Sequence, residues 1–254
     1  MSRLGEAFAR AKREGRTALV CYVMGGDGDT AKLLEAVDEA GADVIELGLP
    51  FSDPIADGPV LQAAATRALA SGATVRGVLK AAASVKLRAP MVAMGYVNPI
   101  ESMGAVRFAE ALREARMDGA IVPDLPLEEA QPLREALAAL DLDLVPLVAP
   151  TTGKERATAI AKSARGFLYN VSVTGVTGAR TALPADLVER LAELRALSPV
   201  PVAVGFGISK PEHAALLKGK ADGVVVGTAL VAMHHEHGVA AAAEFVRSLR
   251  AALT

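Results

Sequence analysis

Two carboxylates lie eleven residues apart in the segment Glu46-Leu-Gly-Leu-Pro-Phe-Ser-Asp-Pro-Ile-Ala-Asp57-Gly-Pro59. Glu46 belongs to the short run Asp43-Val-Ile-Glu-Leu47, and in a strand every second side chain of this run faces the same way. Glu46 then shares a face with Val44, and a carboxyl group in an apolar pocket has a raised pKa that suits proton transfer. Pairing with a buried cation at the strand end is the alternative interpretation.

Asp57 lies in the turn Ala56-Asp-Gly-Pro59, where Pro59 suits the first position of a helix. By itself, Asp57 is explained as a residue that orients this turn or caps the helix. Together with Glu46 it makes a pair of carboxylates that can face one cavity. Different surroundings would give the two groups different pKa values, so that one can act as an acid and the other as a base. We interpret the pair as the candidate acid/base groups.

Polar, glycine-bearing segments follow three further apolar runs. The segment from Tyr169 to Arg180 is long for a strand-to-helix connection; it is either a lid that excludes water or an ordinary connector. Gly205-Phe-Gly-Ile-Ser209 and Gly227-Thr228 follow the last two runs, where barrel enzymes often bind phosphate through backbone N–H groups. The two turns together predict a phosphorylated substrate.

The elements that must position these residues alternate along the chain, as in a parallel sheet with helical crossovers. We expect strands at Ala18–Val23, Asp43–Leu47, Met91–Met94, Gly119–Val122, Leu142–Leu147, Gly166–Asn170, Pro201–Val204 and Gly223–Val226. We expect helices at Thr30–Ala40, Pro59–Ala70, Thr74–Lys86, Ala105–Ala115, Leu127–Leu140, Lys154–Lys162, Pro184–Leu197, Lys210–Leu217, Thr228–His235 and Val239–Ala252. Eight such units in 254 residues predict an α/β fold, a (β/α)8 TIM barrel, with residues 1–254 as a single domain. A doubly wound sheet is the rival, but the turn Met24-Gly-Gly-Asp-Gly28 lacks the Gly-x-Gly-x-x-Gly spacing.

Composition excludes several classes of partner. The net charge of −2, with acids and bases interspersed, argues against nucleic-acid binding. The densest basic stretch, Arg10 to Arg16, is interpreted as the solvated face of a short first helix. Because no uncharged run approaches membrane-spanning length and no signal peptide pattern is present, we expect a cytoplasmic protein without a membrane segment.

The single cysteine and the four histidines are interpreted as structural. Cys21 lies in an apolar run and is expected to be buried without chemistry. The cluster His234, His235 and His237 lacks the spacing of helical metal ligands and precedes Gly238, so a helix end explains it and no metal site is predicted. His213 is interpreted as a surface helix residue.

The segment from Glu46 to Pro59 resembles the signature of the tryptophan synthase alpha subunit family nearly throughout. Further segments that resemble the family are Tyr96-Val-Asn-Pro99, Pro123-Asp-Leu-Pro126, Gly175-Val-Thr-Gly-Ala-Arg180 and Gly205-Phe-Gly-Ile-Ser209, so the resemblance spans essentially the whole chain. Two departures are the turn Met24–Gly28, where the family often has Thr-x-Gly-Asp-Pro, and Thr228, where many members have serine.

The resemblance implies a lyase of tryptophan biosynthesis that cleaves indole-3-glycerol phosphate into indole and glyceraldehyde 3-phosphate by a retro-aldol reaction. Asp57 would hold the indole N–H and stabilise the positive charge on the protonated ring. Glu46 would move protons to the ring carbon and from the neighbouring glycerol hydroxyl. The substrate-binding positions carried over from the resemblance are Tyr22, Leu61, Met94, Ile121, Tyr169, Thr177, Gly178, Phe206, Gly207, Gly227 and Thr228.

The resemblance also implies a partner, a beta subunit that carries pyridoxal phosphate and receives indole through a tunnel in an alpha2-beta2 heterotetramer. No cofactor is implied for this chain itself. Ser52, Asp53 and Pro54 resemble part of the interface. Two rivals remain: another phosphate-binding barrel, such as an indole-3-glycerol phosphate synthase or a sugar-phosphate isomerase, and a catalytically silent scaffold. The segment from Glu46 to Pro59 disfavours the first, and the intact carboxylates and phosphate turns disfavour the second.

Overall fold

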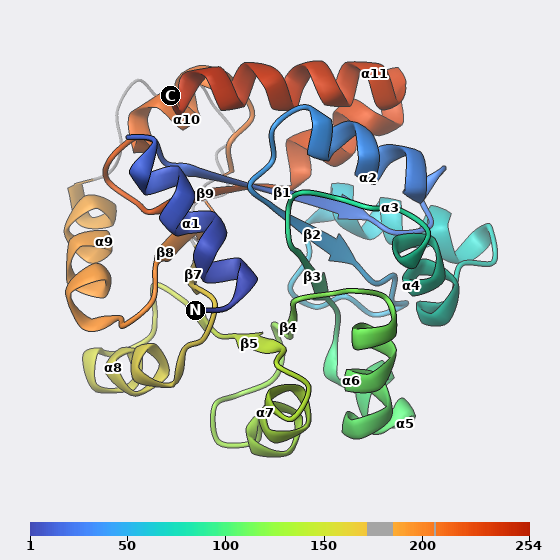
Figure 1. Ribbon diagram of the computed structural model, residues 1–254, viewed down its shortest axis with the longest axis horizontal. Helices are drawn as coiled ribbons and strands as arrows, with labels where there is room; N and C mark the ends of the chain where they lie inside the picture. Colours follow the sequence, from blue (N-terminus) through green and yellow to red (C-terminus); the bar gives the residue numbers. More distant parts are fainter. Residues whose placement is uncertain (172–184, 206) are drawn as a thin grey trace.

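A ring of parallel strands surrounded by helices makes up the computed structural model, which describes residues 1–171, 185–205 and 207–254 (Figure 1). The strands are β1 (Ala18–Met24), β2 (Val44–Gly48), β3 (Met91–Met94), β4 (Gly119–Ile121), β5 (Asp143–Val145), β6 (Leu147–Val148), β7 (Leu168–Val171), β8 (Val202–Gly205) and β9 (Gly223–Val226). They are hydrogen-bonded in the order β5-β4-β3-β2-β1-β9-β8-β7-β6. The two strands at the ends of this order, β5 and β6, are consecutive in the chain.

Pro146 explains why the predicted strand Leu142–Leu147 appears as two short strands. Proline has no N–H to donate to a ladder, so it interrupts pairing within a central strand. β5 pairs with β4, and β6 pairs with β7, so one bent segment joins both edges of the sheet. With β5 and β6 taken as one strand position, the barrel has eight, and the predicted (β/α)8 architecture is confirmed.

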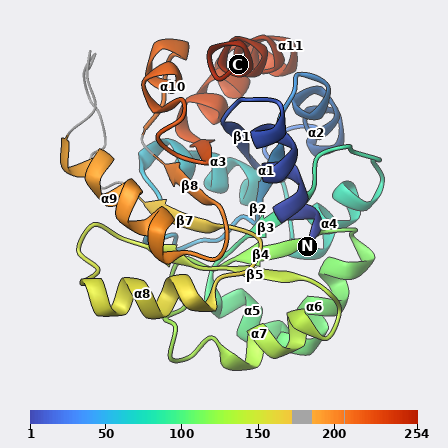
Figure 2. The same cartoon turned by 60° about the vertical axis from the view of Figure 1, so that its left-hand side comes forward.

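The helices lie outside the strands, as the two views in Figures 1 and 2 show. They are α1 (Arg3–Arg13), α2 (Thr30–Glu39), α3 (Pro59–Ala70), α4 (Val75–Ala83), α5 (Val97–Met103), α6 (Ala105–Glu114), α7 (Gln131–Ala138), α8 (Lys154–Ser163), α9 (Ala185–Leu197), α10 (Pro211–Leu217) and α11 (Thr228–Ala252). Gly238 has a φ of 82° and divides α11 in two, as the predicted pair of helices required. None of the helices in the described ranges is both long and apolar enough to cross a membrane.

Two features of the helical layer differ from the sequence prediction. Helix α5 was not anticipated, because Pro99 falls inside it; proline is tolerated there because it lies in the first turn. The predicted helix Leu127–Leu140 begins only at Gln131, where Pro132 occupies an early helical position that suits its fixed φ.

The strands bury both faces, which divides the core into two layers. Inward-facing residues fill the barrel, with Val20, Val44, Val92, Ile121, Val145, Ala203 and Val225 in one buried cluster. Outward-facing residues such as Ile45 and Leu47 belong to a larger cluster beneath the helices. The predicted alternation along β2 is therefore confirmed: Val44 faces the interior, and Glu46, two residues later, shares that face.

An ion-pair network at the amino ends of β1 and β2 corrects the interpretation of Arg16. This residue follows α1 and is buried, not solvated. Its guanidinium donates to both Asp43 oxygens, at 2.5 and 2.8 Å, and its Nε donates to Glu14 at 2.6 Å. Asp43 also accepts from the Leu19 amide at 2.9 Å and from Arg250 at 3.1 Å. Lys12 and Arg13 are exposed, as predicted.

We expect Asp43→Asn to lower the free energy of unfolding by about 3 kcal/mol, because breaking one side of a buried pair leaves the other charge uncompensated. Glu14→Gln is the matched control. It removes a carboxylate from the same arginine, but its side chain is half exposed, so its effect should stay below about 1 kcal/mol. Urea unfolding of the three proteins at pH 7 measures both. Equal losses in the two variants would contradict this ranking.

Candidate active site

Glu46 lies near the carboxyl end of β2, inside the barrel. Its register neighbours are Tyr22 on β1 and Val92 on β3. The side chain is 1% exposed, and its Oε1 atom has no hydrogen-bond partner within the described part of the chain. Burial raises the pKa of Glu46 to about 8. At neutral pH the group is therefore mainly a neutral carboxylic acid.

The alternative interpretation of Glu46, as half of a buried ion pair, finds no support in the described residues. Each of the ion pairs found there involves another carboxylate, and burial alone accounts for the pKa of Glu46. An apolar side chain would pack at this position at least as well as a buried carboxyl group without a cation. A perturbed, unpaired acid of this kind is typical of functional sites.

Two tyrosines stand beside the carboxylates. Burial raises the pKa of Tyr22 and of Tyr169, and the charges of Glu46 and Asp57 raise both pKa values further. Two glycines leave room for the phenol groups. A Cβ atom at Gly48 would overlap the Tyr22 hydroxyl, and one at Gly205 would lie 2.9 Å from the Tyr169 hydroxyl. The hydroxyl groups of both tyrosines thus lie at the strand ends, and they are protonated at neutral pH.

Asp57 lies in the loop between β2 and α3 and is half-buried. Burial raises its pKa, while a hydrogen bond from the Tyr96 hydroxyl acts in the opposite direction. The capping interpretation is wrong, because the N-cap residue of α3 is Gly58 and that cap has no side-chain hydrogen bond. The backbone carbonyl of Asp57 instead accepts from the Gln62 amide at 2.8 Å. The Asp57 carboxylate therefore caps no helix and interacts with the Tyr96 hydroxyl.

Tyr96 is a site residue that the sequence did not assign. Its hydroxyl accepts from the Ala56 amide at 3.2 Å and donates to Asp57. Its ring stacks on Phe51, with centroids 5.4 Å apart. The Val97 amide at the start of α5 donates to Asp124 at 2.9 Å, which fixes the backbone next to Tyr96. The segment Tyr96-Val-Asn-Pro99 stood out in the sequence, but no pattern connects it to Asp57.

We expect Tyr96→Phe to lower kcat for the reaction at this site by about tenfold with little change in stability, because a hydrogen bond to a charged group is worth about 1.5 kcal/mol. Loss of that bond should also shift the Asp57-dependent limb of the pH–rate profile to higher pH. Phe51→Leu is the control: it removes the ring stacking but leaves the hydroxyl, so the limb should stay in place. An unshifted limb in Tyr96→Phe would show that the hydroxyl does not act on Asp57.

The apolar residues carried over from the resemblance lie together. Tyr22 belongs to a buried cluster against which Leu61 and Met94 pack. Met94 also packs against the barrel-interior cluster, which contains Ile121 and contacts Tyr169. The structure thus joins these side chains on the same end of the barrel as Glu46. They form an apolar surface that suits a flat aromatic ring.

The glycine turns are placed at the ends of β8 and β9, as predicted. Gly207 is exposed with a φ of 61°. Gly227 precedes α11, and a Cβ there would lie 3.5 Å from the Tyr22 Cβ atom. Thr228 is exposed at the first position of α11. The Val231 amide donates to the Gly227 carbonyl at 3.0 Å and so makes the first backbone hydrogen bond of this helix. Thr177, Gly178, Phe206 and residues 172–180 of the segment interpreted as a lid lie outside the described residues.

Of the predictions for the cysteine and the histidines, the one for Cys21 is confirmed and the one for His213 is wrong. Cys21 is fully buried, as expected, and burial raises its pKa. His213 is buried, so its interpretation as a surface residue is wrong: it turns inward and lies 3.4 Å from the Ser209 hydroxyl. His237 lies 3.6 Å from Glu236 at the kink of α11. Within the described ranges, no three histidine, cysteine or acidic side chains are grouped to hold a metal ion.

The sequence of this chain is similar to those of known proteins of one family. The family model described as Tryptophan synthase alpha chain matches residues 8–252. A tryptophan synthase alpha chain from Carboxydothermus hydrogenoformans is 50% identical over 236 residues, which cover 91% of this chain and 88% of the relative. A second, from Thermosynechococcus vestitus, is 45% identical over 259 residues, covering 99% and 97%.

Solved structures agree with the sequence matches. The tryptophan synthase subunit alpha of Legionella pneumophila superposes with a TM-score of 0.90 at 36% identity, covering 100% of this chain and 98% of that one. A tryptophan synthase chain of Mycobacterium tuberculosis gives a TM-score of 0.91 at 37% identity, covering 99% and 98%. Sequence, fold and site geometry agree, and the chain belongs to the tryptophan synthase alpha chain family.

Proposed function

We propose that Glu46 and Asp57 are the acid/base pair with which this chain cleaves indole-3-glycerol phosphate. The family is that of a lyase acting on this substrate, which yields indole and glyceraldehyde 3-phosphate. The observation that carries the residue assignment is Glu46 itself: a carboxyl group inside the barrel, without a cation, whose pKa is raised to about 8 by burial. A carbon–carbon bond can break here only when the indole becomes a leaving group, and that requires a proton on carbon.

Glu46 supplies that proton. As a neutral acid it protonates the ring carbon that bears the side chain, and the resulting carboxylate accepts the proton of the adjacent glycerol hydroxyl. The hydroxyl becomes the aldehyde, the carbon–carbon bond breaks, and its electron pair returns to the ring to give indole. Glu46 ends protonated, so no proton is gained or lost overall. A pKa near the working pH lets one group serve as acid and then as base.

Asp57 stabilises the charge that arises between these steps. Protonation of the ring carbon leaves a positive charge centred on the indole nitrogen, and a carboxylate that accepts its N–H lowers the energy of that state. The hydrogen bond from Tyr96 favours the ionised form of Asp57. The two carboxylates thus differ in surroundings as their roles require: Glu46 has no donor in the described residues, and Asp57 has one.

The substrate is held by two kinds of surface. Tyr22, Leu61, Met94, Ile121 and Tyr169 would contact the ring. Gly207, Gly227 and Thr228 would bind the phosphate, since the first N–H groups of α11 are free of bonds within the helix and point out of its amino end. We extend the assignment to Thr177, Gly178 and Phe206 on the resemblance alone.

The test of the proposed reaction is indole release from indole-3-glycerol phosphate by the purified chain, followed colorimetrically. Slow release is expected from the chain alone and much faster release with a cognate beta subunit. Absence of indole under both conditions would contradict the proposal. Release of carbon dioxide from a related phosphorylated substrate, or isomerisation of a sugar phosphate, without formation of indole would instead favour another phosphate-binding barrel.

The partner is a tryptophan synthase beta subunit, to which the pyridoxal phosphate-dependent activity belongs. We propose that the loop after β2 contacts it, within an alpha2-beta2 complex, and that this chain carries no cofactor of its own. Ser52 and Asp53 are exposed in this loop, Pro54 is half-buried, and the neighbouring Ile55 is 82% exposed. We place the protein in the cytoplasm and treat residues 1–254 as one domain.

Ile55→Asp is expected to weaken activation by the beta subunit by about tenfold, because burying one aliphatic side chain in an interface contributes roughly 1.5 kcal/mol. Leu69→Asp is the control, since Leu69 is 37% exposed in the last turn of α3, at the far end of that helix from this loop. Indole formation is titrated with the partner in each case. If both variants are activated like the parent chain, the loop is not the contact surface.

A further inference from the structure

The turn between β1 and α2, Met24-Gly-Gly-Asp-Gly28, lies at the carboxyl end of the barrel and has no role in the proposed function. Its backbone is attached to the strand that carries Glu46. The Gly25 amide donates to the carbonyl of Gly48, the last residue of β2, at 2.9 Å. The turn therefore has a defined position relative to Glu46.

The same turn packs tightly against the carboxyl end of α3. Gly26 has a φ of 83°, and a Cβ atom there would lie 2.4 Å from the Ala73 Cβ atom, so a side chain would have no room. The Gly26 carbonyl accepts from the Ser71 hydroxyl at 3.3 Å, and its amide donates to the Thr30 hydroxyl at 2.8 Å. The turn and the end of α3 are thus in direct contact.

Asp27 binds α3 through a pair of hydrogen bonds. Arg67 donates from Nε to Asp27 Oδ1 at 2.9 Å and from Nη2 to Asp27 Oδ2 at 2.7 Å. The Asp27 side chain is 10% exposed, so salt and water screen the pair less than they screen a surface ion pair. Two parallel bonds to one carboxylate fix the direction of the guanidinium as well as its distance. The pair therefore determines where Arg67 lies.

Packing alone holds α3 weakly along its axis. The fully buried residues of this helix are Ala64, Ala65 and Ala68. Each buries a single methyl group, so this face contributes little apolar area and interlocks poorly with its neighbours. An α-helix is stiff, so a displacement at Arg67 is carried about 12 Å along the axis to Pro59. The ion pair thus fixes the position at which α3 begins.

Asp57 lies just before α3, and an irregular loop, residues 49–56, joins it to the strand of Glu46. We propose that Asp27 and Arg67 are positioning residues, which hold the Asp57 carboxylate in its working place relative to Glu46. They make a second connection between the two carboxylates, from β2 through the turn to α3. This inference rests on the proposed roles of Glu46 and Asp57.

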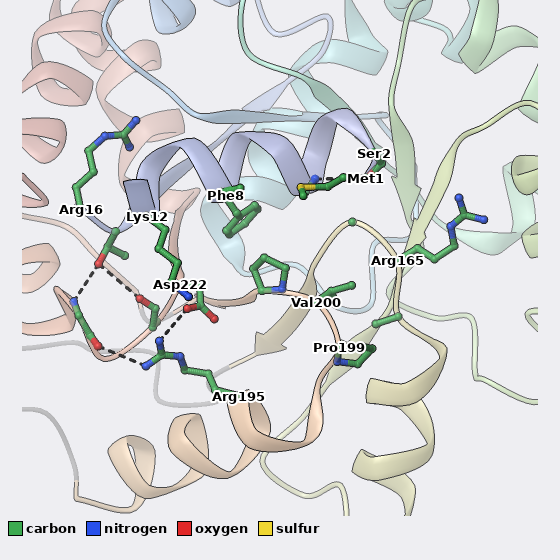
Figure 3. A pocket seen from close by; sticks show the side chains of 18 of the residues that line it. Met1, Ser2, Phe8, Lys12, Arg16, Arg165, Arg195, Pro199, Val200 and Asp222 are labelled. Carbon is green, nitrogen blue, oxygen red and sulfur yellow. Dashed lines mark hydrogen bonds and ion pairs between the residues drawn. The ribbon is translucent and has the colours of Figure 1, made fainter. Parts of the chain in front are cut away.

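Arg67→Met removes the pair and keeps a long side chain. We expect it to lower kcat for indole formation by about tenfold, because a small misplacement of a reacting group has an effect of this size or larger. Arg195→Met is the matched control. Arg195 donates to Asp222 at 2.9 Å, and both line the cavity at the amino end of the barrel (Figure 3). The control should change kcat less than about twofold, and equal losses in the two variants would overturn the inference.

A double-mutant cycle with Asp57→Asn separates positioning from a general effect on the fold. Once the Asp57 charge is lost, Arg67→Met should lower kcat by less than about twofold, because no carboxylate remains to be positioned. Similar losses with and without the Asp57 charge would overturn the inference and leave the proposed function intact. A near-normal rate in Asp57→Asn alone would contradict both the proposed role of Asp57 and this inference.

Hydrogen exchange tests the same inference without reference to activity. The Gln62 amide donates to the Gly58 carbonyl at 3.0 Å in the first turn of α3. In Arg67→Met this amide should lose part of its protection, because the start of the helix is no longer held. The parent chain and Arg195→Met should show the same slower exchange. Unchanged exchange of the Gln62 amide in Arg67→Met would show that the pair does not hold the start of α3.

Discussion

Replacing Glu46 by glutamine is expected to lower kcat for indole formation by about 10²- to 10⁴-fold, the range that general acid/base groups contribute. Glutamine keeps the shape of the side chain but can neither give a proton to the ring carbon nor accept one from the hydroxyl. Binding of substrate should change little, because Glu46 holds a proton and not the phosphate or the ring. Steady-state kinetics with and without the beta subunit measures the effect. A kcat within threefold of the parent chain would exclude Glu46 as the acid.

The same substitution should raise stability at alkaline pH. The pKa of Glu46 is about 8 in the folded chain, above its ordinary value of 4.5, so the folded state binds the proton more tightly than the unfolded state. The contribution of Glu46 to the free energy of unfolding is therefore most favourable below pH 4.5. It falls as the pH rises from about 4.5 to 8 and is constant above pH 8. Each pH unit in this window corresponds to about 1.4 kcal/mol.

Urea unfolding at several pH values tests this dependence. Glu46→Gln should be more stable than the parent chain at pH 8 by several kcal/mol, and the difference should shrink towards pH 4.5. A gain in stability together with a loss of activity is the signature of a residue kept for chemistry. If the stability difference is the same at both ends of the range, Glu46 ionises normally and is not a buried acid.

Replacing Asp57 by asparagine is expected to lower kcat by about 10²- to 10³-fold. Loss of one preorganised group that stabilises charge in a transition state typically has an effect of this size. Asparagine can still accept a hydrogen bond from the indole N–H, but it cannot balance the positive charge on the protonated ring. The Michaelis constant should therefore change less than kcat. Pre-steady-state and steady-state indole formation together separate the two quantities.

Asp53→Asn provides the matched control for Asp57→Asn. Asp53 lies four residues earlier in the same loop, is exposed, and is proposed to contact the partner. Its substitution should leave indole formation by the isolated chain unchanged. If Asp57→Asn and Asp53→Asn lower the rate of the isolated chain to the same extent, loop conformation and not charge stabilisation would explain both.

Local patterns in the sequence were enough to predict the barrel and the position of Glu46. Alternation along β2 placed Glu46 on the face of Val44, and the structure places Val44 in the interior cluster. That argument needs only the geometry of a strand and the assumption of one buried face. Pro146 divides its strand without changing the topology, because the residues on either side keep their neighbours.

Contacts between distant segments could not be predicted in this way. Tyr96 acts on Asp57, and Arg16 acts on Asp43, across gaps in sequence that carry no periodic signal. The charge pattern around Arg16 predicts a solvated stretch, because charge alone does not show that the Asp43 carboxylate lies beside it, just before β2. His213 differs, because its contact with Ser209 is local; what the sequence does not show is that this face of α10 packs inward.

Glu46 should be a neutral acid inside the barrel at neutral pH, and a titration of its carboxyl group shows directly whether it is. Infrared difference spectra between the parent chain and Glu46→Gln, recorded from pH 4 to 10, isolate the carbonyl band of the protonated carboxyl group. We predict that this band persists at pH 7 and disappears with a midpoint of about 8. A midpoint near the ordinary value of 4.5 would contradict the account.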